Sequence, residues 1–436
     1  MVVRTKGMKI VLIMPRIGLY QKGRGFRKYL RYAPLTLTTL AALVPKEFNA
    51  KIRIIDEGVE EVDYSKIDAD LVGVTGITGH ILRSYEIADS FRARGIPVII
   101  GGPHATLMPE EAKQHADSVV IGHAYKTFPE LLYDFRYGKM KEFYHDLNPS
   151  LENIPIARRD LLKKRGYISI NTIQAVFGCP NQCEFCVISS MKSKYLHRPV
   201  HEVITEIKAM KSKLIFFLDP SPIEDKVYIK ELYRKMIPLK VKWMGLSTSR
   251  IIDDEELLNL AVKSGCSGLL IGIESVSTKS LEKMNKPFNS VQKHHELIKK
   301  LHKHNIPIMG CFVFGSDEDN KTIFKETVDF IMKTGLDLPR FTVYTPFPGT
   351  PLFTRLKKEG RILTEDWSKY NAQNVVFQPK NMTKKELEDG LEYAWKECYR
   401  PKNIAKRLLK SRTKLLYMIV ANIGYMRYSE DHKKYR

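Results

Sequence analysis

The sequence predicts an α/β fold in two parts: a doubly wound parallel sheet, then an open barrel of six β/α units that ends in a basic helical tail. Two successive patterns of apolar, strand-like runs alternating with helical segments indicate this fold. A third observation places chemistry in it, because three cysteines follow the first strand of the second pattern. The length of 436 residues agrees with more than one hydrophobic core.

The first pattern covers residues 1–145. Its strand-like runs are KIVLIMP, KIRIID, LVGVTG, PVIIGG and SVVIG, separated by helical segments such as PLTLTTLAALVPKE and HILRSYEIADSFRARG. Ligands of such sheets bind at the carboxyl ends of the strands, although glycines there also serve as ordinary turn residues. The candidate binding residues at these ends are Thr75, Gly76, Gly101, Gly102 and Gly122.

A polar linker over residues 146–165 precedes the second pattern, which covers residues 166–350. Its six strand-like runs are ISINTIQAVFG, LIFFLD, KVKWMGLSTS, GLLIGIES, IMGCFVFG and RFTVYTPF. Six units fall short of the eight of a closed barrel, so we expect an open barrel whose chemistry lies at the carboxyl ends of its strands. Residues 351–436 are expected to form a helical extension.

The stretch FGCPNQCEFC carries Cys179, Cys183 and Cys186. A 4Fe–4S cluster is normally held by four thiolates, and three leave one iron free to bind another group. A zinc site would need a fourth ligand, for which His197 is the nearest histidine, but such sites rarely follow a barrel strand. The remaining cysteines are scattered, so we expect no disulfide framework.

The CxxxCxxC spacing after the first strand of a partial barrel resembles the radical S-adenosylmethionine (radical SAM) superfamily. The resemblance implies that the open iron chelates SAM, which is cleaved to a hydrogen-abstracting 5'-deoxyadenosyl radical. It also implies an aromatic contact beside the cluster, polar contacts to the amino, ribose and carboxylate groups, and a backbone contact to adenine. The SAM-binding residues implied in this way are Phe185, Asp219, Ser247, Arg250, Glu274, Lys286 and Gly315. For each polar one alone, a solvated loop residue is the alternative.

Four N-terminal segments, RYAPLTLTTLAALVP, DADLVGVTGIT, VIIGGPHATLMPEEA and GHAYKTFPELL, resemble the cobalamin-binding class of these enzymes, the class B radical SAM methyltransferases. The resemblance implies a Rossmann-like cobalamin-binding domain before a TIM-like radical SAM barrel. The DxHxxG signature is absent after Pro15, so we expect no axial histidine on cobalt.

The predicted function is methylation of an unactivated carbon of a lipid or other small molecule. The predicted cofactors are a 4Fe–4S cluster, SAM and cobalamin, with flavodoxin or ferredoxin as a candidate reductant. The alternatives are radical cyclisation, oxidation or carbon–carbon coupling without methyl transfer. A tRNA methylthiotransferase or a cobalamin carrier is disfavoured, and nucleic acid is not an expected partner. The sequence identifies no catalytic residue.

Much of the net charge of +22 lies in the tail, where IAKRLLKSRTKLLYMIVANIGYMRY interleaves cations with apolar residues. A single helix from about Lys402 to Arg427 would suit an anionic membrane surface or would pack on the barrel with its cations in water. The N-terminal apolar run is too short to span a bilayer. We therefore expect a cytoplasmic protein with peripheral contact to the inner face of the membrane.

Overall fold

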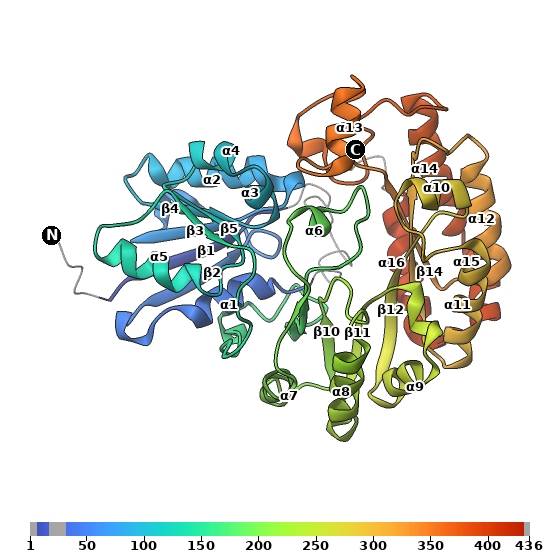
Figure 1. Ribbon diagram of the computed structural model, residues 1–436, viewed down its shortest axis with the longest axis horizontal. Helices are drawn as coiled ribbons and strands as arrows, with labels where there is room; N and C mark the ends of the chain where they lie inside the picture. The colour runs from blue at the N-terminus through green and yellow to red at the C-terminus, as the bar shows by residue number, and fades with distance from the viewer. Residues whose placement is uncertain (1–6, 17–31, 431–436) are drawn as a thin grey trace. The chain divides into compact units, whose positions relative to one another are not determined.

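The computed structural model describes residues 7–16 and 32–430 (Figure 1). Contacts between residues divide the chain into two compact units. The first contains the chain up to Ile173 together with Val187–Met210. The second contains Gln174–Cys186 and the chain from Lys211 onward. The cysteine loop, residues 179–186, therefore belongs to the second unit.

The first unit contains a six-stranded parallel sheet in the order β2-β1-β3-β4-β5-β6. All five predicted strands are present, and β6 is an addition that the sequence analysis missed because FYHD contains no continuous apolar run. The chain winds outward in both directions from β1, which places the ligand crevice of a doubly wound sheet beside β1 and β3. The strands are β1 (Lys9–Met14), β2 (Lys51–Asp56), β3 (Leu71–Thr75), β4 (Val98–Gly101), β5 (Ser118–Gly122) and β6 (Phe143–Asp146).

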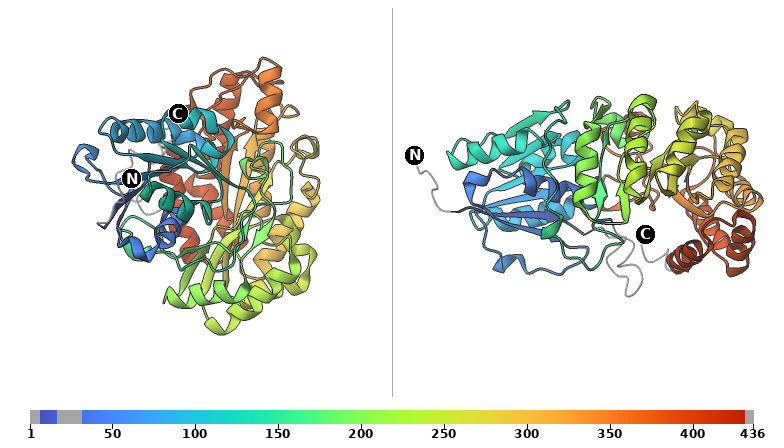
Figure 2. Two further views of the ribbon diagram at one scale, coloured as in Figure 1. Left: turned by 60° about the vertical axis from the view of Figure 1, so that its left-hand side comes forward. Right: turned by 90° about the horizontal axis from the view of Figure 1, so that it is seen from below.

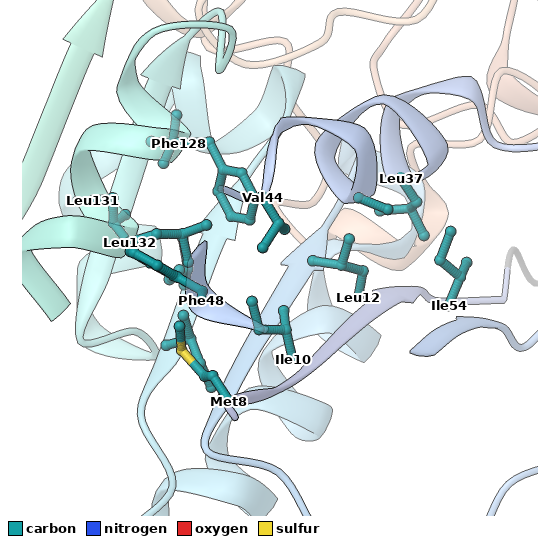
Figure 3. Packing of buried hydrophobic residues seen from close by; sticks show 14 of the residues in the cluster. Met8, Ile10, Leu12, Leu37, Val44, Phe48, Ile54, Phe128, Leu131 and Leu132 are labelled. Carbon is teal, nitrogen blue, oxygen red and sulfur yellow. The ribbon is translucent and has the colours of Figure 1, made fainter. Parts of the chain in front are cut away.

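Helices cover both faces of this sheet (Figure 1). One face carries α2 (Ile81–Arg92), α3 (Pro103–Leu107) and α4 (Pro109–Gln114), and the other carries α1 (Leu35–Leu43) and α5 (Thr127–Arg136). Side chains alternate along a strand, so Ile10 and Leu12 point into the cluster shared with α1 and α5 (Figure 3), while Val11 and Ile13 point to the opposite face. This two-sided burial explains the unbroken apolar runs.

The second sheet has six strands in the order β14-β13-β12-β11-β10-β7, and the pairs from β10 to β14 are parallel. Helices follow the strands and lie outside them (Figures 1 and 2), which confirms the open barrel. The strands are β7 (Thr172–Ile173), β10 (Leu214–Phe217), β11 (Lys242–Ser247), β12 (Cys266–Glu274), β13 (Ile308–Phe314) and β14 (Leu338–Val343). The helices are α8 (Lys226–Met236), α9 (Glu255–Lys263), α10 (Thr278–Lys283), α11 (Val291–Lys303) and α12 (Ile323–Thr334).

The predicted first strand of the barrel, ISINTIQAVFG, is broken into β7 and β8 (Val176–Phe177). The short elements α6 (Val187–Ser190), β9 (Leu196–His197) and α7 (Val200–Ala209) follow the cysteine loop. At the other end of the chain, β14 is followed by α13 (Pro351–Lys358), α14 (Lys384–Cys398), α15 (Pro401–Ser411) and α16 (Leu415–Glu430). Within the described ranges, no helix combines the length and apolar content needed to cross a bilayer.

The prediction of one continuous tail helix is wrong. Helix α15 ends at Ser411, and Arg412, which follows it, has a left-handed backbone with φ 51°. Arg407, one of the cations of the predicted tail helix, is fully buried, whereas both interpretations of the tail expected its cations to be exposed. Its guanidinium donates hydrogen bonds to the carbonyl oxygens of Leu336 (2.9 Å), Asp337 (2.7 Å) and Cys398 (3.0 Å). A further hydrogen bond of 2.9 Å runs to Asn422 Oδ1 on α16. Arg407 therefore connects α15 and α16 with each other and with the barrel.

We predict that Arg407→Ala lowers the free energy of unfolding by about 3 kcal/mol, because several buried carbonyl groups lose their donor. All three tryptophans belong to the second unit, so their fluorescence during urea unfolding of the full-length protein reports on that unit. The exposed neighbour provides the control, since Lys406→Ala is expected to change stability by less than about 0.5 kcal/mol. Equal unfolding midpoints for the two variants would contradict the anchoring role.

Candidate functional site

The cysteine loop begins where the first barrel strand breaks. The Asp219 carboxylate, at the carboxyl end of β10, accepts hydrogen bonds from the backbone N–H groups of Ala175 (2.7 Å) and Val176 (2.6 Å). These bonds satisfy two consecutive backbone N–H groups at the break. In a regular strand, consecutive N–H groups point to opposite sides and could not both reach one carboxylate. Gly178, with φ 71°, then turns the chain into the loop. Asp219 was predicted to contact SAM, and that contact stays a prediction; the structure shows that Asp219 fixes the path of the chain into the loop.

The loop brings three thiol groups into one region of the second unit. Burial raises the pKa of the Cys183 thiol to about 12, and the nearby positive charge of Lys286 opposes this shift. The other two thiols act on the same pKa, which indicates that all three lie within electrostatic reach of one another. The Cys186 N–H donates to the Cys183 carbonyl at 3.1 Å, which tightens the end of the loop.

These thiols fit a cluster better than a single ion. Among the described residues, no three His, Cys, Asp or Glu side chains are gathered closely enough to hold one metal ion. A 4Fe–4S cluster needs a wider arrangement, because each thiolate binds a different iron. The chain supplies three thiols and leaves the fourth iron for another ligand.

Two predicted SAM-binding residues form a buried ion pair. Lys286 Nζ lies 2.5 Å from Glu274 Oε1 and donates to the Gly272 carbonyl at 3.1 Å. Burial lowers the pKa of Lys286. The negative charges of Glu274, Cys183 and Cys186 outweigh this effect, so the net pKa is raised. Glu274 itself has a left-handed backbone with φ 65°, an unusual conformation for a side chain of its size. A Cβ at position 272 would collide with both charged groups.

A second polar group reaches the first cysteine. Arg250, a predicted SAM-binding residue, donates to Glu224 Oε2 at 2.6 Å and stacks 4.4 Å from the centre of the Phe288 ring. The other oxygen of Glu224 lies 3.3 Å from the Asn181 amide, which in turn lies 3.4 Å from the Cys179 sulfur. Neither Glu224 nor Asn181 was predicted from the sequence, although an amide inside the cysteine motif was a signal for Asn181.

Of the remaining predicted SAM-binding residues, Ser247 and Gly315 lie at other strand ends and Phe185 lies in the cysteine loop. Ser247 ends β11 and is buried. Gly315 follows β13 with φ 103°, and its N–H donates to the buried carboxylate of Asp319 at 2.9 Å. Phe185 packs edge-on against Tyr344, with 5.5 Å between the ring centres. The roles of these residues toward SAM stay predictions.

A further buried residue, Asn289, was missed by the sequence analysis. Its amide donates to the carbonyl oxygens of Gly272 (2.9 Å) and Ile273 (3.2 Å), at the end of β12. Ser249, just after β11, donates to Asn289 Oδ1 at 2.6 Å. This asparagine ties two strand ends together beside the ion pair, and no motif around it marks that position.

In the first unit, the predicted cobalamin-binding residues gather at the carboxyl edge of the sheet. Thr75 and Gly101 are register partners on β3 and β4. Gly102 has φ 105°, and a Cβ there would lie 2.7 Å from Thr75 Oγ1 and 2.9 Å from the Gly76 carbonyl. Gly122 has φ 84° and no room for a Cβ beside the Asp146 carbonyl. Tight turns therefore explain Gly102 and Gly122, and a cobalamin contact remains a prediction.

Two buried histidines flank this edge and were missed by the sequence analysis. His104 Nδ1 lies 3.1 Å from Thr78 Oγ1, and its Nε2 lies 3.2 Å from Glu111 Oε1. Burial lowers the pKa of His80 to about 4, so its ring stays neutral near pH 7. No axial histidine was predicted in the segment after Pro15. That segment lies mostly outside the described residues, so this expectation stays a prediction.

Comparisons with known proteins match each part of the chain. Residues 173–331 match the Radical SAM superfamily, residues 30–132 the B12 binding domain, and residues 350–419 a domain of unknown function, DUF4070. The chain is 33% identical over 390 residues to bacteriochlorophyllide d C-12(1)-methyltransferase of Chlorobaculum tepidum, covering 86% of this chain and 84% of that protein. It is 29% identical over 415 residues to bacteriochlorophyllide d C-8(2)-methyltransferase of the same organism, covering 89% and 90%.

Among solved structures, the cobalamin-dependent S-adenosylmethionine radical enzyme OxsB with aqua-cobalamin bound shares the fold. The TM-score is 0.67 at 15% sequence identity, and the match covers 97% of this chain and 72% of that one.

We predict that simultaneous replacement of Cys179, Cys183 and Cys186 by Ala abolishes the broad visible absorbance and the bound iron of anaerobically reconstituted protein. The reason is that the cluster loses its three protein ligands, and no three His, Cys, Asp or Glu side chains of the described residues gather closely enough to take their place. The matched control is Cys311→Ala, which removes a partly exposed thiol from β13 and is expected to leave the cluster intact. A full cluster in the triple variant would refute the assignment.

Proposed function

Because the chain belongs to the radical SAM enzymes that carry a B12-binding domain, we propose that it transfers a methyl group to an unactivated carbon of a small-molecule or lipid substrate. Membership in this family confirms the predicted resemblance and the predicted cofactors, namely a 4Fe–4S cluster, SAM and cobalamin. The observation that supports methyl transfer is 33% identity to a methyltransferase across 86% of this chain.

In this proposal, Cys179, Cys183 and Cys186 hold the cluster. Opening of the Glu274–Lys286 pair would free the carboxylate to accept from the ribose hydroxyls of SAM and the ammonium to bind the SAM carboxylate. The contact surface of SAM is completed by Phe185, Asp219, Ser247, Arg250 and Gly315. The cobalamin contacts are Thr75, Gly76, Gly101, Gly102 and Gly122.

When bound, the cluster supplies an electron to SAM and cobalamin carries the methyl group. An unactivated carbon has no lone pair with which to attack a methyl donor, so a hydrogen atom must be removed first. The chain contributes by fixing the thiolates, by balancing the charge of SAM with the buried pair and by excluding water from the strand ends.

The same site supports a second candidate, a radical cyclisation, oxidation or carbon–carbon coupling without methyl transfer. The cysteine loop and the SAM contacts would serve that chemistry equally well. A tRNA methylthiotransferase is less suitable, because those enzymes carry cluster cysteines in an N-terminal domain, and the first cysteine of this chain is Cys179. A cobalamin carrier would have no use for the cysteine loop.

Product analysis separates the two candidates. We predict that reconstituted protein, given SAM, cobalamin, a low-potential reductant such as flavodoxin or ferredoxin, and an extract of a strain lacking the gene, forms 5'-deoxyadenosine and S-adenosylhomocysteine in equal amounts. Methyl transfer consumes one SAM for hydrogen abstraction and one to restore the methyl carrier, and the product gains one CH₂ by mass spectrometry. 5'-Deoxyadenosine without S-adenosylhomocysteine would favour radical chemistry without methyl transfer, and neither product would contradict both candidates.

We also propose that the tail contacts an anionic membrane peripherally. Helix α16 is apolar on nearly every side: Met418 is buried against the barrel, while Leu416 is 74% and Tyr417 66% exposed. A helix that is apolar all round normally lies inside a protein or a membrane. The exposed apolar residues on both tail helices are Leu409, Leu415, Leu416, Tyr417, Ile419, Val420 and Ile423.

The charge around this surface favours anionic lipid as the occupant. Over residues 401–430 the exposed cations are Lys402, Lys406, Lys410, Arg412 and Arg427, against the single exposed acid Glu430. Cations beside exposed apolar side chains are typical of helices that lie in a membrane interface. Such contact would suit a lipid substrate and would place the enzyme at the inner face of the membrane.

We predict that the protein co-sediments with anionic vesicles and that added salt weakens the attachment. Replacing Lys402 and Lys406 with Glu is expected to weaken partitioning at least fivefold, since each cation contributes roughly 1 kcal/mol. Lys384→Glu with Lys385→Glu on α14 makes the same change in net charge and serves as the control. Equal sedimentation of all proteins at both salt concentrations would contradict membrane attachment. If the parent protein is a dimer and Leu416→Ser converts it to a monomer, the surface binds a second copy of the chain instead.

A further inference from the structure

The cysteine loop is held by a residue far away in the sequence. Glu184 lies between the second and third cysteines, and its carboxylate accepts hydrogen bonds from Arg355 Nε (2.6 Å) and Nη2 (3.3 Å) and from the Tyr344 hydroxyl (2.9 Å). Its backbone is held as well, because its N–H donates to the Met284 carbonyl (3.2 Å) and its carbonyl accepts from the Leu352 N–H (3.1 Å). Two of these four partners belong to α13.

Arg355 is itself fixed by a second carboxylate. Its Nη1 donates to Asp317 Oδ2 at 2.6 Å, while Arg361 donates to the other oxygen of Asp317 at 2.7 Å. The Asn381 amide donates to the Asp317 carbonyl at 2.6 Å. The guanidinium thus bridges two acids in a planar arrangement that a lysine cannot reproduce. The four charged side chains, Glu184, Arg355, Asp317 and Arg361, are at least partly buried, so water screens the pairs less than at an open surface.

We infer that residues 350–361, the start of the DUF4070 segment, form part of the cluster site, with Arg355 as a positioning residue for the cysteine loop. This inference rests on the cluster assignment in the proposed function. The loop contains no strand or α-helix of its own from Cys179 to Cys186, so its shape depends on such external bonds. Groups that orient metal ligands without touching the metal are typically needed for full metal affinity.

The charge of Arg355 gives a second reason for this role. Glu184 directly follows one ligand cysteine in the chain, and Arg355 neutralises its carboxylate at 2.6 Å. Without the guanidinium, an unpaired carboxylate would repel the thiolates and disfavour the reduced, more negative cluster. Cluster retention and the reduction potential should therefore change together.

The test compares anaerobically reconstituted full-length variants. We expect Arg355→Ala to release its cluster to a chelator about tenfold faster than the parent, to shift its reduction potential to more negative values and to alter the EPR signal of the reduced cluster with SAM. Arg355→Lys should restore part of the retention, because it returns the charge without the bidentate geometry. Lys357→Ala on the same helix, which removes an exposed pair with Glu365, should match the parent.

Hydrogen exchange of residues 179–186 in cluster-free protein provides a readout that does not depend on the cluster. Faster exchange in Arg355→Ala than in Lys357→Ala, with an unchanged melting temperature, supports positioning. Equal exchange, together with equal cluster release, overturns the inference and leaves the cluster assignment intact. A parent that binds no iron would refute the proposed function and, with it, this inference, whereas equal behaviour of the variants in a parent that holds the cluster would refute the inference alone.

Discussion

The carboxylate of Asp219 is the constraint on which the second unit depends. It accepts hydrogen bonds from two successive amides, those of Ala175 and Val176, where the first barrel strand breaks. A continuous strand would carry the chain past the barrel edge, whereas the break lets Gly178 turn it into the cysteine loop. Burying a carboxylate is costly unless donors surround it, so the break and the acid stabilise each other.

Around the loop, ionised side chains occur in pairs that balance one another. The Lys286 ammonium meets Glu274, Arg250 meets Glu224, and Arg355 meets Glu184. Each pair takes one member from a strand end or the cysteine loop and the other from a different element. These three pairs carry no net charge, and a charged cofactor can exchange partners with a pair instead of burying an uncompensated charge.

Much of the fold follows from the sequence, and less of the site does. The apolar alternation predicted both sheets, because strands buried on two faces produce long unbroken runs such as KIVLIM. The short strand FYHD was missed because it lacks that signal, and the break of the tail helix was missed because Arg412 adopts a conformation usually marked by glycine. The cysteine motif identified the loop, but partners such as Glu224 and Asn289 come from separate strand ends, and their proximity depends on tertiary geometry that no local pattern records.

The contact between Glu184 and Arg355 joins residues 171 positions apart. During synthesis the chain emerges from its N-terminus, so the cysteines appear long before the helix that holds their loop. Contacts of such long sequence range also form late in folding, since the intervening chain must first be ordered. The cysteine loop thus reaches its final shape only after the barrel strands and α13 have assembled, and delivery of iron and sulfide belongs after translation, to a nearly finished protein.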